Sequence, residues 1–436
     1  MFYDAVMLAR AGAEIGRALI GSRVREVLQL HHDEVALTFG RGASPIALTL
    51  ASSPQFGRVY LGPPPEGKGP LQAFGLALKK HLRGARLLEV VQPGFDRVLR
   101  LTFAECEGFG AECRRALVVE VMGKHGNMLL LDEGERILSC AKHVPARLNR
   151  YRELMEGEPY LPPPSFEKLD PREATVDALR DRVAANPQAT PAALLRDEVL
   201  GASKVFAAEV LCRLASDAGV VGELRAGDLE ALVALVRRLA AEAAQDGAVY
   251  IYERPAGSNL PARFAYPLSL CCCGPAVGEA PTLSAALGPL MLAERNAQRE
   301  RELRERLSAA ARAQLRELTE RLGKLRAQVR QAEGAESLRR TAELLLAQPH
   351  AARPYASEVE LVDYYAEDAP TVTVTLDPPG DVHGTARKLF DRCKRAARIL
   401  QRVPPLIEQA EQESEYLAAV LDEVELAQGL EDLTEI

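Results

Sequence analysis

Residues 118–132 read VVEVMGKHGNMLLLD, and this stretch decides the fold of the first part of the chain. An apolar, β-branched run enters a polar turn at 123–127, and a second apolar run leaves it. Two such runs around a turn that contains Gly and Asn predict a β-hairpin. The turn also holds Lys124 and His125, with Glu120 just before it, and a hairpin requires none of these three. We interpret them as a recognition surface carried on a rigid sheet.

The sequence on both sides of this hairpin predicts more short strands and two helices. Helical periodicity covers residues 3–20 and roughly 69–82. Turn signals separate the expected strands, which are 24–30, 35–39, 45–50, 58–61, 86–91, 97–103, 116–122, 128–131 and 136–140. Together these elements predict an N-terminal β-sandwich with flanking helices that spans residues 1–165.

A second, helical domain is expected over residues 166–246, where the chain becomes rich in Ala. Its expected helices are 175–185, 192–200, 204–215 and 228–244. The short turn at 201–203 has the spacing of a helix-hairpin-helix, whose turn can offer N–H groups to a phosphate. A plain helical hairpin explains the same spacing and is the preferred interpretation. Residues 247–288 are expected to form an extended connector.

The remainder, 289–436, is expected to be a long antiparallel coiled-coil arm. Leucines between 315 and 325 follow the 3-4 spacing of a coiled-coil seam, and apolar residues between 389 and 424 keep the same phase. A small module at about 340–382, with a strand at 371–376, is expected at the tip. Pro404-Pro405 should kink or restart the returning helix. The overall class is therefore α+β with several domains.

Composition limits what this chain can be. Its 436 residues are 47% hydrophobic, and no run of eighteen apolar residues predicts a membrane span. The N-terminus lacks a basic segment before an apolar core, so we expect no secretory signal and a cytoplasmic location. Eight cysteines are scattered, except for three in a row at 271–273, which suit neither a zinc site nor a disulfide framework. We expect them to be reduced thiols.

Charge is distributed unevenly along the chain. The net charge of −7 argues against bulk nucleic-acid binding, yet the returning helix has a basic segment. Its candidate ribosome-contacting residues are Arg387, Lys388, Arg392, Lys394 and Arg395. A solvated helix face explains this pattern about as well as RNA contact does.

Known catalytic signatures are missing from the sequence. It contains no phosphate-binding loop with Gly-Lys-Ser/Thr, no Gly-x-Ser-x-Gly and no zincin motif. No second His or Cys lies at ligand spacing from His125, so we expect no metal there. These observations favour a binding protein over an enzyme.

Three motifs in order resemble one known family. The 118–132 hairpin resembles the core of the NFACT-N domain, which opens the RqcH/NEMF family of ribosome-associated quality-control factors. The stretch GFDRVLRL at 94–101 resembles the Asp-Arg strand of that family, and a third motif comprises 142–145, 149–152 and 159–164. The resemblance is collinear from about Tyr3 to about Gln428.

The resemblance implies roles for particular residues. Asp96, Arg97, Glu120 and Val121 match family positions required for tRNA engagement and C-terminal tailing, and Asp4 matches an aspartate implicated in the same way. Taken alone, Asp96-Arg97 reads as an ordinary surface ion pair and Asp4 as a helix N-cap. Three turn residues complete the candidate tRNA site. Lys124 would contact phosphate, His125 would stack on or hydrogen-bond to a nucleotide, and Asn127 also reads as a simple turn residue.

The family implies a binding factor without a cofactor. Such a factor binds tRNA, here alanyl-tRNA, and an obstructed large ribosomal subunit that still holds peptidyl-tRNA. Its arm reaches rRNA and protein at the stalk base, and alanines are added without mRNA while the ribosome supplies the peptide-bond chemistry. The family continues into an NFACT-R domain, which would begin about where the sequence ends at Ile436. From these residues alone we therefore expect tRNA or ribosome binding rather than tailing.

Two other classes of function stay open at the level of sequence. One is a surface adhesin that binds fibronectin or extracellular matrix, which the expected lack of a signal peptide disfavours. The other is a nucleic-acid-binding protein with the fold of formamidopyrimidine-type DNA glycosylases. Those enzymes use a Pro-Glu pair exposed after Met removal, whereas Phe2-Tyr3 follows Met1 here, so that chemistry is not expected.

Overall fold

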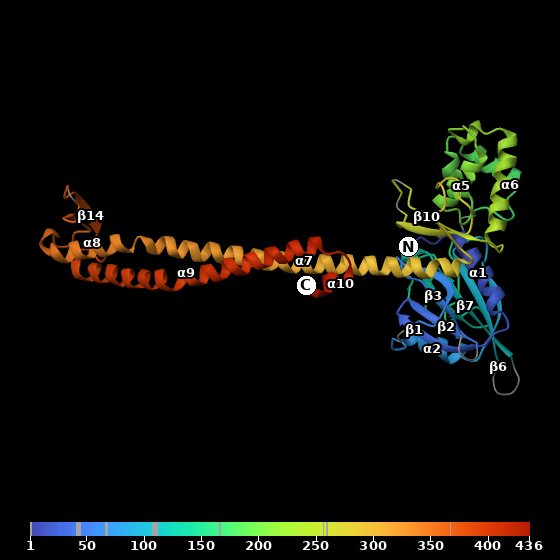
Figure 1. Ribbon diagram of the computed structural model, residues 1–436, viewed down its shortest axis with the longest axis horizontal. Coiled ribbons are helices and arrows are strands. Elements are labelled where there is room, and N and C mark those ends of the chain that lie inside the picture. The colour runs from blue at the N-terminus through green and yellow to red at the C-terminus, as the bar shows by residue number, and fades with distance from the viewer. Residues whose placement is uncertain are drawn as a thin grey trace. The chain divides into compact units, whose positions relative to one another are not determined.

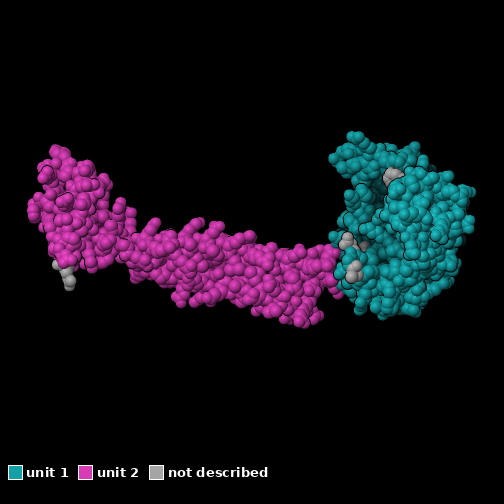
Figure 2. Space-filling view, turned by 90° about the horizontal axis from the view of Figure 1, so that it is seen from above, with its two compact units in different colours: residues 1–294 teal, residues 295–436 magenta. Residues whose placement is uncertain are grey.

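A computed structural model describes residues 2–40, 45–65, 69–106, 112–164, 167–255, 257–258, 260–366 and 368–436. The chain forms two compact units, residues 1–294 and residues 295–436, which are called unit 1 and unit 2 below (Figure 2). The α+β class is confirmed, with several antiparallel sheets and a largely helical second unit. The division into four domains stays a prediction.

The first helix of unit 1, α1 (Ala5–Leu19), lies between the sheets and the later helices of the unit (Figure 1). Asp4 caps this helix, because its side chain accepts a hydrogen bond from the backbone N–H of Met7 at 3.0 Å. Apolar residues on several sides of α1 are buried, including Val6, Leu8 and Ile15. The helix therefore lies inside the unit rather than on its surface.

Two antiparallel sheets share one apolar core with α1. The first runs in the order β1 (Val24–His31), β2 (Glu34–Phe39), β3 (Ile46–Ala51), β4 (Arg58–Gly62). The second runs β5 (Arg86–Val91), β6 (Val98–Cys106), β7 (Glu112–Glu120), β8 (Asn127–Leu131), β9 (Ile137–Cys140). Alternation along β6 explains the packing, since Leu99 and Leu101 enter the shared core while Val98 joins a smaller cluster with Val118 and Leu129.

Helices and a small third sheet complete unit 1. The helices are α2 (Ala73–Leu82), α3 (Val176–Ala185), α4 (Pro191–Glu198), α5 (Lys204–Leu214) and α6 (Ala226–Ala243). The third sheet has the order β11 (Arg263–Tyr266), β10 (Val249–Glu253), β12 (Gly278–Ala280). Side-chain caps at Thr175, Thr190 and Ser203 start α3, α4 and α5.

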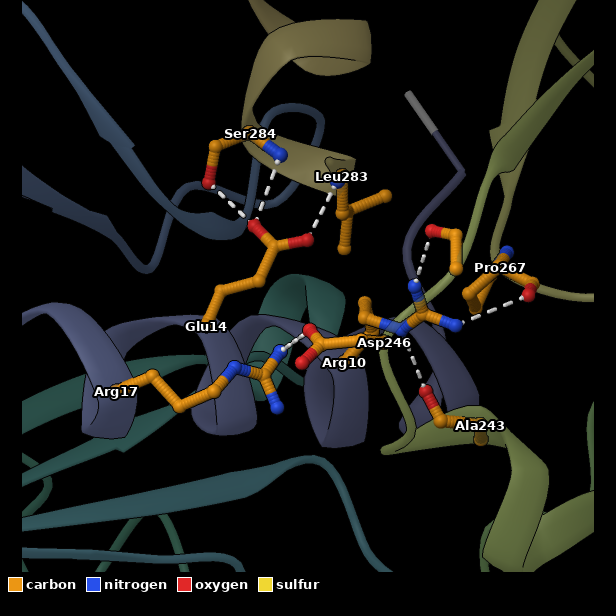
Figure 3. A network of polar contacts seen from close by, with 9 residues as sticks. Arg10, Glu14, Arg17, Ala243, Asp246, Pro267, Leu283 and Ser284 are labelled. Atoms are coloured by element: carbon orange, nitrogen blue, oxygen red, sulfur yellow. Dashed lines mark hydrogen bonds and ion pairs between the residues drawn. The ribbon is translucent and has the colours of Figure 1, made fainter. Parts of the chain in front are cut away.

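Buried charges on α1 fasten it to these later elements, as Figure 3 shows. The guanidinium of Arg10 donates to the carbonyl oxygens of Ala243 at 2.9 Å and Pro267 at 3.3 Å. The carboxylate of Glu14 accepts from the backbone N–H of Leu283 at 2.6 Å and the hydroxyl of Ser284 at 2.8 Å. Glu14 therefore anchors the first turn of α7 (Leu283–Glu333), which begins in unit 1 and continues into unit 2.

Unit 2 contains α7 together with α8 (Ala335–Ala347), β13 (Glu358–Val362), β14 (Thr371–Thr375), α9 (Val382–Leu426) and α10 (Leu430–Glu435). Within it α7 and α9 lie side by side and antiparallel (Figure 1). Leu318 and Leu322 pack with Ala410 and Leu417, and an ion pair of 2.6 Å joins Arg326 to Glu411. The strand predicted at 371–376 is confirmed as β14, which pairs with β13.

Prolines lie inside both long helices. Helix α7 begins at Leu283, before Pro289, where the arm was expected to begin, and α9 continues through Pro404 and Pro405, so the restart that was one of the two predicted outcomes does not occur. A proline removes one helical hydrogen bond, but the neighbouring turns keep theirs. Contacts outside the backbone add to this, through Glu14 at the start of α7 and through the buried Val403 and Ala410 of α9. Among the described residues, no helix has the length and apolarity that crossing a membrane requires.

Candidate functional site

The Asp-Arg motif and the hairpin motif meet at one end of the second sheet. Strands β6 and β7 pair with Val98 opposite Glu120. One step further, the N–H of Val121 donates to the carbonyl of Arg97 at 2.8 Å. Asp96-Arg97 and Glu120-Val121, which lie far apart in sequence, are therefore neighbours in space.

Hydrogen bonds shape the loop that carries Asp96 and Arg97. A carboxylate oxygen of Asp96 accepts from the backbone N–H of Arg97 at 2.7 Å. The amide of Gln92 donates to the carbonyl of Asp96 at 2.7 Å and to that of Ala5 at 3.0 Å, which ties the loop to α1. Asp96 is half-buried, and the Arg97 side chain is exposed. The Asp96 carboxylate thus supports the loop backbone beside an exposed guanidinium.

Asp4 is a buried carboxylate with partners on three elements. Besides capping α1, it accepts from the hydroxyls of Ser203 at 2.6 Å and Tyr266 at 3.1 Å. Burial raises the pKa of Asp4, although the hydrogen bonds from Ser203, Met7 and Tyr266 act in the opposite direction. The N-cap interpretation of Asp4 is confirmed by the backbone geometry. Asp4 also fixes where α5 begins relative to α1.

The turn between α4 and α5 packs directly on the Asp96-Arg97 loop. Gly201 has a φ of +70°, and a Cβ built there would lie 1.8 Å from the carbonyl oxygen of Phe95. Only glycine fits such an approach. Ser203 then caps α5 by accepting from the N–H of Phe206 at 3.1 Å. The first turn of α5 is therefore held beside the loop.

These elements enclose a cavity of about 780 Å³. Five predicted site residues line it: Asp4, Asp96, Arg97, Val121 and His125. The α4–α5 turn contributes Gly201, Ala202 and Ser203 to the same wall. The structure thus gathers residues from α1, the β6 and β7 ends, the 3-10 turn Gly123–His125 and the start of α5 around one space.

Glu120 belongs to this site without lining the cavity. It is fully buried and forms a two-point ion pair with Arg152, at 2.6 and 2.7 Å. The Tyr160 hydroxyl donates to the same carboxylate at 3.0 Å, and burial followed by the Glu120 charge raises the pKa of Tyr160. Arg152 does line the cavity. Glu120 therefore holds a cavity wall in place through Arg152.

The remaining turn residues differ in exposure. Asn127 is buried, and its side chain donates to the carbonyl of Lys142 at 2.8 Å and accepts from its N–H at 2.9 Å. Asn127 is therefore the first residue of β8 (Asn127–Leu131) rather than part of the turn, and its side chain ties this strand to the segment after β9. Lys124 and His125 are exposed, and only His125 of the two lines the cavity.

Sequence reasoning missed three cations of the cavity. Lys168, Arg196 and Arg152 line it together with Arg97, and the ammonium of Lys168 donates to the carbonyl of Arg196 at 2.9 Å. Arg152 lies in the 149–152 motif, which was a usable signal. Lys168 and Arg196 are brought close by an isolated β-bridge between Leu169 and Val199. No local sequence pattern predicts this pairing. Because Arg152 is paired with Glu120, the charges of Lys168, Arg196 and Arg97 are the ones that make the cavity suited to phosphate.

The candidate residues of the arm lie on α9 in unit 2. Arg387, Lys388, Arg392, Lys394 and Arg395 are all exposed. Lys388 pairs with Asp377 at 2.9 Å, and this hydrogen bond lowers the pKa of Asp377. Across the described part of the chain, no group of three or more His, Cys, Asp or Glu is placed to hold a metal ion.

Comparisons with known proteins show which proteins this chain is similar to. The chain is 24% identical over 438 residues to the Rqc2 homolog RqcH of Bacillus subtilis, covering 100% of this chain and 74% of that protein. It is 32% identical over 173 residues to the Rqc2 homolog RqcH of Streptococcus pneumoniae, covering 39% of this chain and 31% of that protein. The N-terminal part of the fibronectin/fibrinogen-binding protein from Streptococcus suis has the same fold, with a TM-score of 0.54. That match is 23% identical and covers 67% of this chain and 99% of that structure.

A family model provides the assignment. It describes the NFACT N-terminal and middle domains, and it matches residues 4–436. The chain therefore belongs to the NFACT family.

Proposed function

We propose that this chain is a ribosome-associated quality-control factor and that unit 1 binds tRNA at the cavity. The observation that carries the proposal is the gathering of Asp4, Asp96, Arg97, Val121 and His125 around one space. The role in ribosome quality control is supported by the names of two relatives. One is called Rqc2 homolog RqcH, and the other, from fission yeast, is called ribosome quality control complex subunit 2.

The dimensions and chemistry of the cavity favour part of a tRNA loop. A space of about 780 Å³ can receive an unstacked nucleotide but not a duplex. Proteins read RNA mostly at such splayed single-stranded bases. Exposed Arg97, with Lys168 and Arg196, would bind phosphate, while His125 at the rim would stack on a base or hydrogen-bond to it.

Further steps follow from family membership and are part of the same proposal. The factor would recruit alanyl-tRNA to a large subunit that holds peptidyl-tRNA, and α9 would contact rRNA or protein at the stalk base. The chain spans 74% of the Bacillus subtilis relative. In this proposal, alanine tailing is an activity of the factor on the ribosome. The protein would supply positioning, and the ribosome would supply the chemistry of peptide-bond formation.

A binding titration tests the tRNA site. Labelled tRNA is titrated at near-physiological salt with duplex DNA as competitor, using wild type and Asp96→Ala/Arg97→Ala. The matched control is Glu253→Ala/Arg263→Ala. It removes an exposed acid and an exposed base that form an ion pair of 3.3 Å with each other and do not line the cavity. We expect selective tRNA binding that the first variant loses and the control keeps. Equal binding by all three proteins, or a preference for DNA, would overturn the proposal.

A further inference from the structure

Four cysteines lie together where α5 meets the segment that follows β11. Cys212 is on α5, and Cys271, Cys272 and Cys273 follow one another in sequence. The sulfur atoms of Cys271 and Cys212 are 2.6 Å apart, and those of Cys272 and Cys273 are 3.7 Å apart. This cluster lies outside the cavity lining and has no role in the proposed tRNA binding.

The backbone around Cys212 and Cys271 is held firmly on both sides. Arg213 donates to the carbonyl of Ser269 at 2.6 Å, which ties α5 to the segment just before Cys271. The buried carboxylate of Glu209 accepts from Arg213 at 2.6 Å and from the N–H of Cys272 at 3.1 Å. These contacts keep the two thiols facing each other, because they fix the chain one or two residues from each cysteine.

We propose that Cys212 and Cys271 form a reversible disulfide when a hydroperoxide is present. Both residues are exposed, so an oxidant can reach them, and their separation requires little movement to form a bond. Cys272 and Cys273 are half-buried and are adjacent in the chain, which disfavours a bond between them.

The chemistry balances with hydrogen peroxide as the oxidant. The sulfur of Cys212 attacks one peroxide oxygen, the O–O bond breaks, and a sulfenic acid and one water result. The sulfur of Cys271 then attacks that of Cys212, the S–O bond breaks, and the hydroxyl leaves as a second water with the proton of Cys271. Two thiols are oxidised by two electrons in total, and one peroxide is reduced.

The hydrogen bond fits this order of events. Cys271 donates to the sulfur of Cys212, and desolvation followed by that bond raises the pKa of Cys271 to about 12. A raised pKa of Cys271 suits the thiol that attacks second, after the sulfenic acid has formed. The same bond results whichever of the two sulfurs meets the oxidant first.

The disulfide would fasten α5 to the end of the third sheet. It closes the loop between residues 212 and 271, which restricts the unfolded chain and stabilises the folded unit. Ser203, the N-cap of α5, lines the cavity, so a bond that fastens α5 would also restrain that part of the wall under oxidising conditions. A thiol reductant would reverse it.

Peptide mapping of the full chain tests the bond. Wild type, Cys212→Ser and Cys113→Ser are treated with hydrogen peroxide, remaining thiols are alkylated, and peptides are separated without reductant. We expect a cross-linked peptide that joins Cys212 to Cys271 in wild type and in Cys113→Ser, and its loss in Cys212→Ser. Both serine variants should fold, because Cys212 is exposed and Cys113 is half-buried.

The melting temperature gives the second readout. Oxidised wild type should melt higher than reduced wild type, the difference should vanish with dithiothreitol, and Cys212→Ser should show no difference. Free alkylated Cys212 and Cys271 after oxidation would overturn the proposal. So would a bond between Cys272 and Cys273, or an equal gain in the Cys212→Ser variant.

Discussion

At the scale of single residues, Glu120 shows how a side chain can serve a cavity that it does not line. Its carboxylate is fully buried and neutralises Arg152, whose side chain is also buried apart from its face on the cavity. An ion pair of this kind contributes little net stability, but losing one partner leaves an uncompensated charge. Loss of Glu120 should therefore act on the fold first and on binding second.

The first prediction concerns Glu120→Gln. Because the charge of Arg152 would stay buried without its partner, the free energy of unfolding should fall by about 3–5 kcal/mol, measured by urea denaturation. Glu253→Gln is the control, since its pair with Arg263 is largely exposed and should contribute less than about 1 kcal/mol. Equal losses in the two variants would contradict the positioning role of Glu120.

The second prediction is a pH dependence that comes from Asp4. Burial raises its pKa above the ordinary value of 3.8, so the native state keeps a proton that the unfolded chain has released. The contribution of Asp4 to stability is therefore complete below pH 3.8 and is lost as the pH rises through the raised pKa.

Asp4→Asn tests this pH dependence. Asparagine also caps helices and carries no charge. If the variant loses one of the Asp4 hydrogen bonds, its unfolding free energy therefore changes by an amount that does not vary with pH. The unfolding free energy of wild type should fall relative to that of the variant as the pH rises from 3.8 toward neutrality. Urea denaturation at a series of pH values measures this difference. Parallel profiles for the two proteins would show that the Asp4 pKa is not raised.

The site was only partly predictable at this scale. The motifs identified Asp96-Arg97 and Glu120-Val121 separately, and the register of β6 on β7 brings them together. The hairpin pattern identified His125 as a surface residue, but it could not show that Glu120 faces inward to Arg152. Such long-range pairs leave no periodic signal, because the two residues belong to different elements.

At the scale of elements, the α4–α5 turn depends on one glycine. Gly201 has a positive φ and lies against the carbonyl of Phe95. Replacing it with alanine adds backbone strain of about 1–2 kcal/mol and overpacking of about 1–3 kcal/mol. The turn should therefore move away from the Asp96-Arg97 loop and open the cavity wall.

The third prediction compares Gly201→Ala with Gly84→Ala. Gly84 also has a positive φ, of +85°, but no atom lies within 4 Å of a Cβ built there. Both variants should lose stability through strain, and only Gly201→Ala should also lose tRNA affinity. Thermal denaturation and the tRNA titration measure the two effects. Unchanged tRNA binding by a folded Gly201→Ala protein would separate the turn from the site.

Most elements followed from periodicity, and the exceptions have physical causes. Helix α1 and the predicted strands of the first two sheets are present because alternation and turn residues specify them locally. Proline was a poor guide to helix ends at Pro289 and Pro404, where packing outweighs one missing hydrogen bond. Strand β12 was missed because its three residues are too few to show an alternation, whereas β13 alternates between exposed and buried residues and was overlooked.

At the scale of the whole molecule, the local clusters of positive charge matter more for binding than the net charge does. The net charge is −7, yet cations gather at the cavity of unit 1 and on α9 of unit 2. Attraction of phosphate falls off within about 8 Å at physiological salt, so such local clusters decide binding. The two clusters should therefore act on different partners.

The fourth prediction separates these clusters. Replacing Arg387, Arg392, Lys394 and Arg395 with alanine should weaken binding to large ribosomal subunits and leave tRNA binding unchanged, because these side chains belong to unit 2. Lys79→Ala/Lys80→Ala, on the exposed face of α2, should change neither. Co-sedimentation with large subunits and the tRNA titration measure the two activities. A loss of tRNA affinity in the α9 variant would place the tRNA contact on the arm.

The most direct test of the account is to ask where tRNA lies on unit 1. A photoreactive benzoylphenylalanine would replace His125 at the cavity rim or Lys79 on α2, and the protein would be irradiated with tRNA. We expect a tRNA cross-link from position 125 and none from position 79. Binding of tRNA without a cross-link from position 125, or equal cross-linking from both positions, would contradict it.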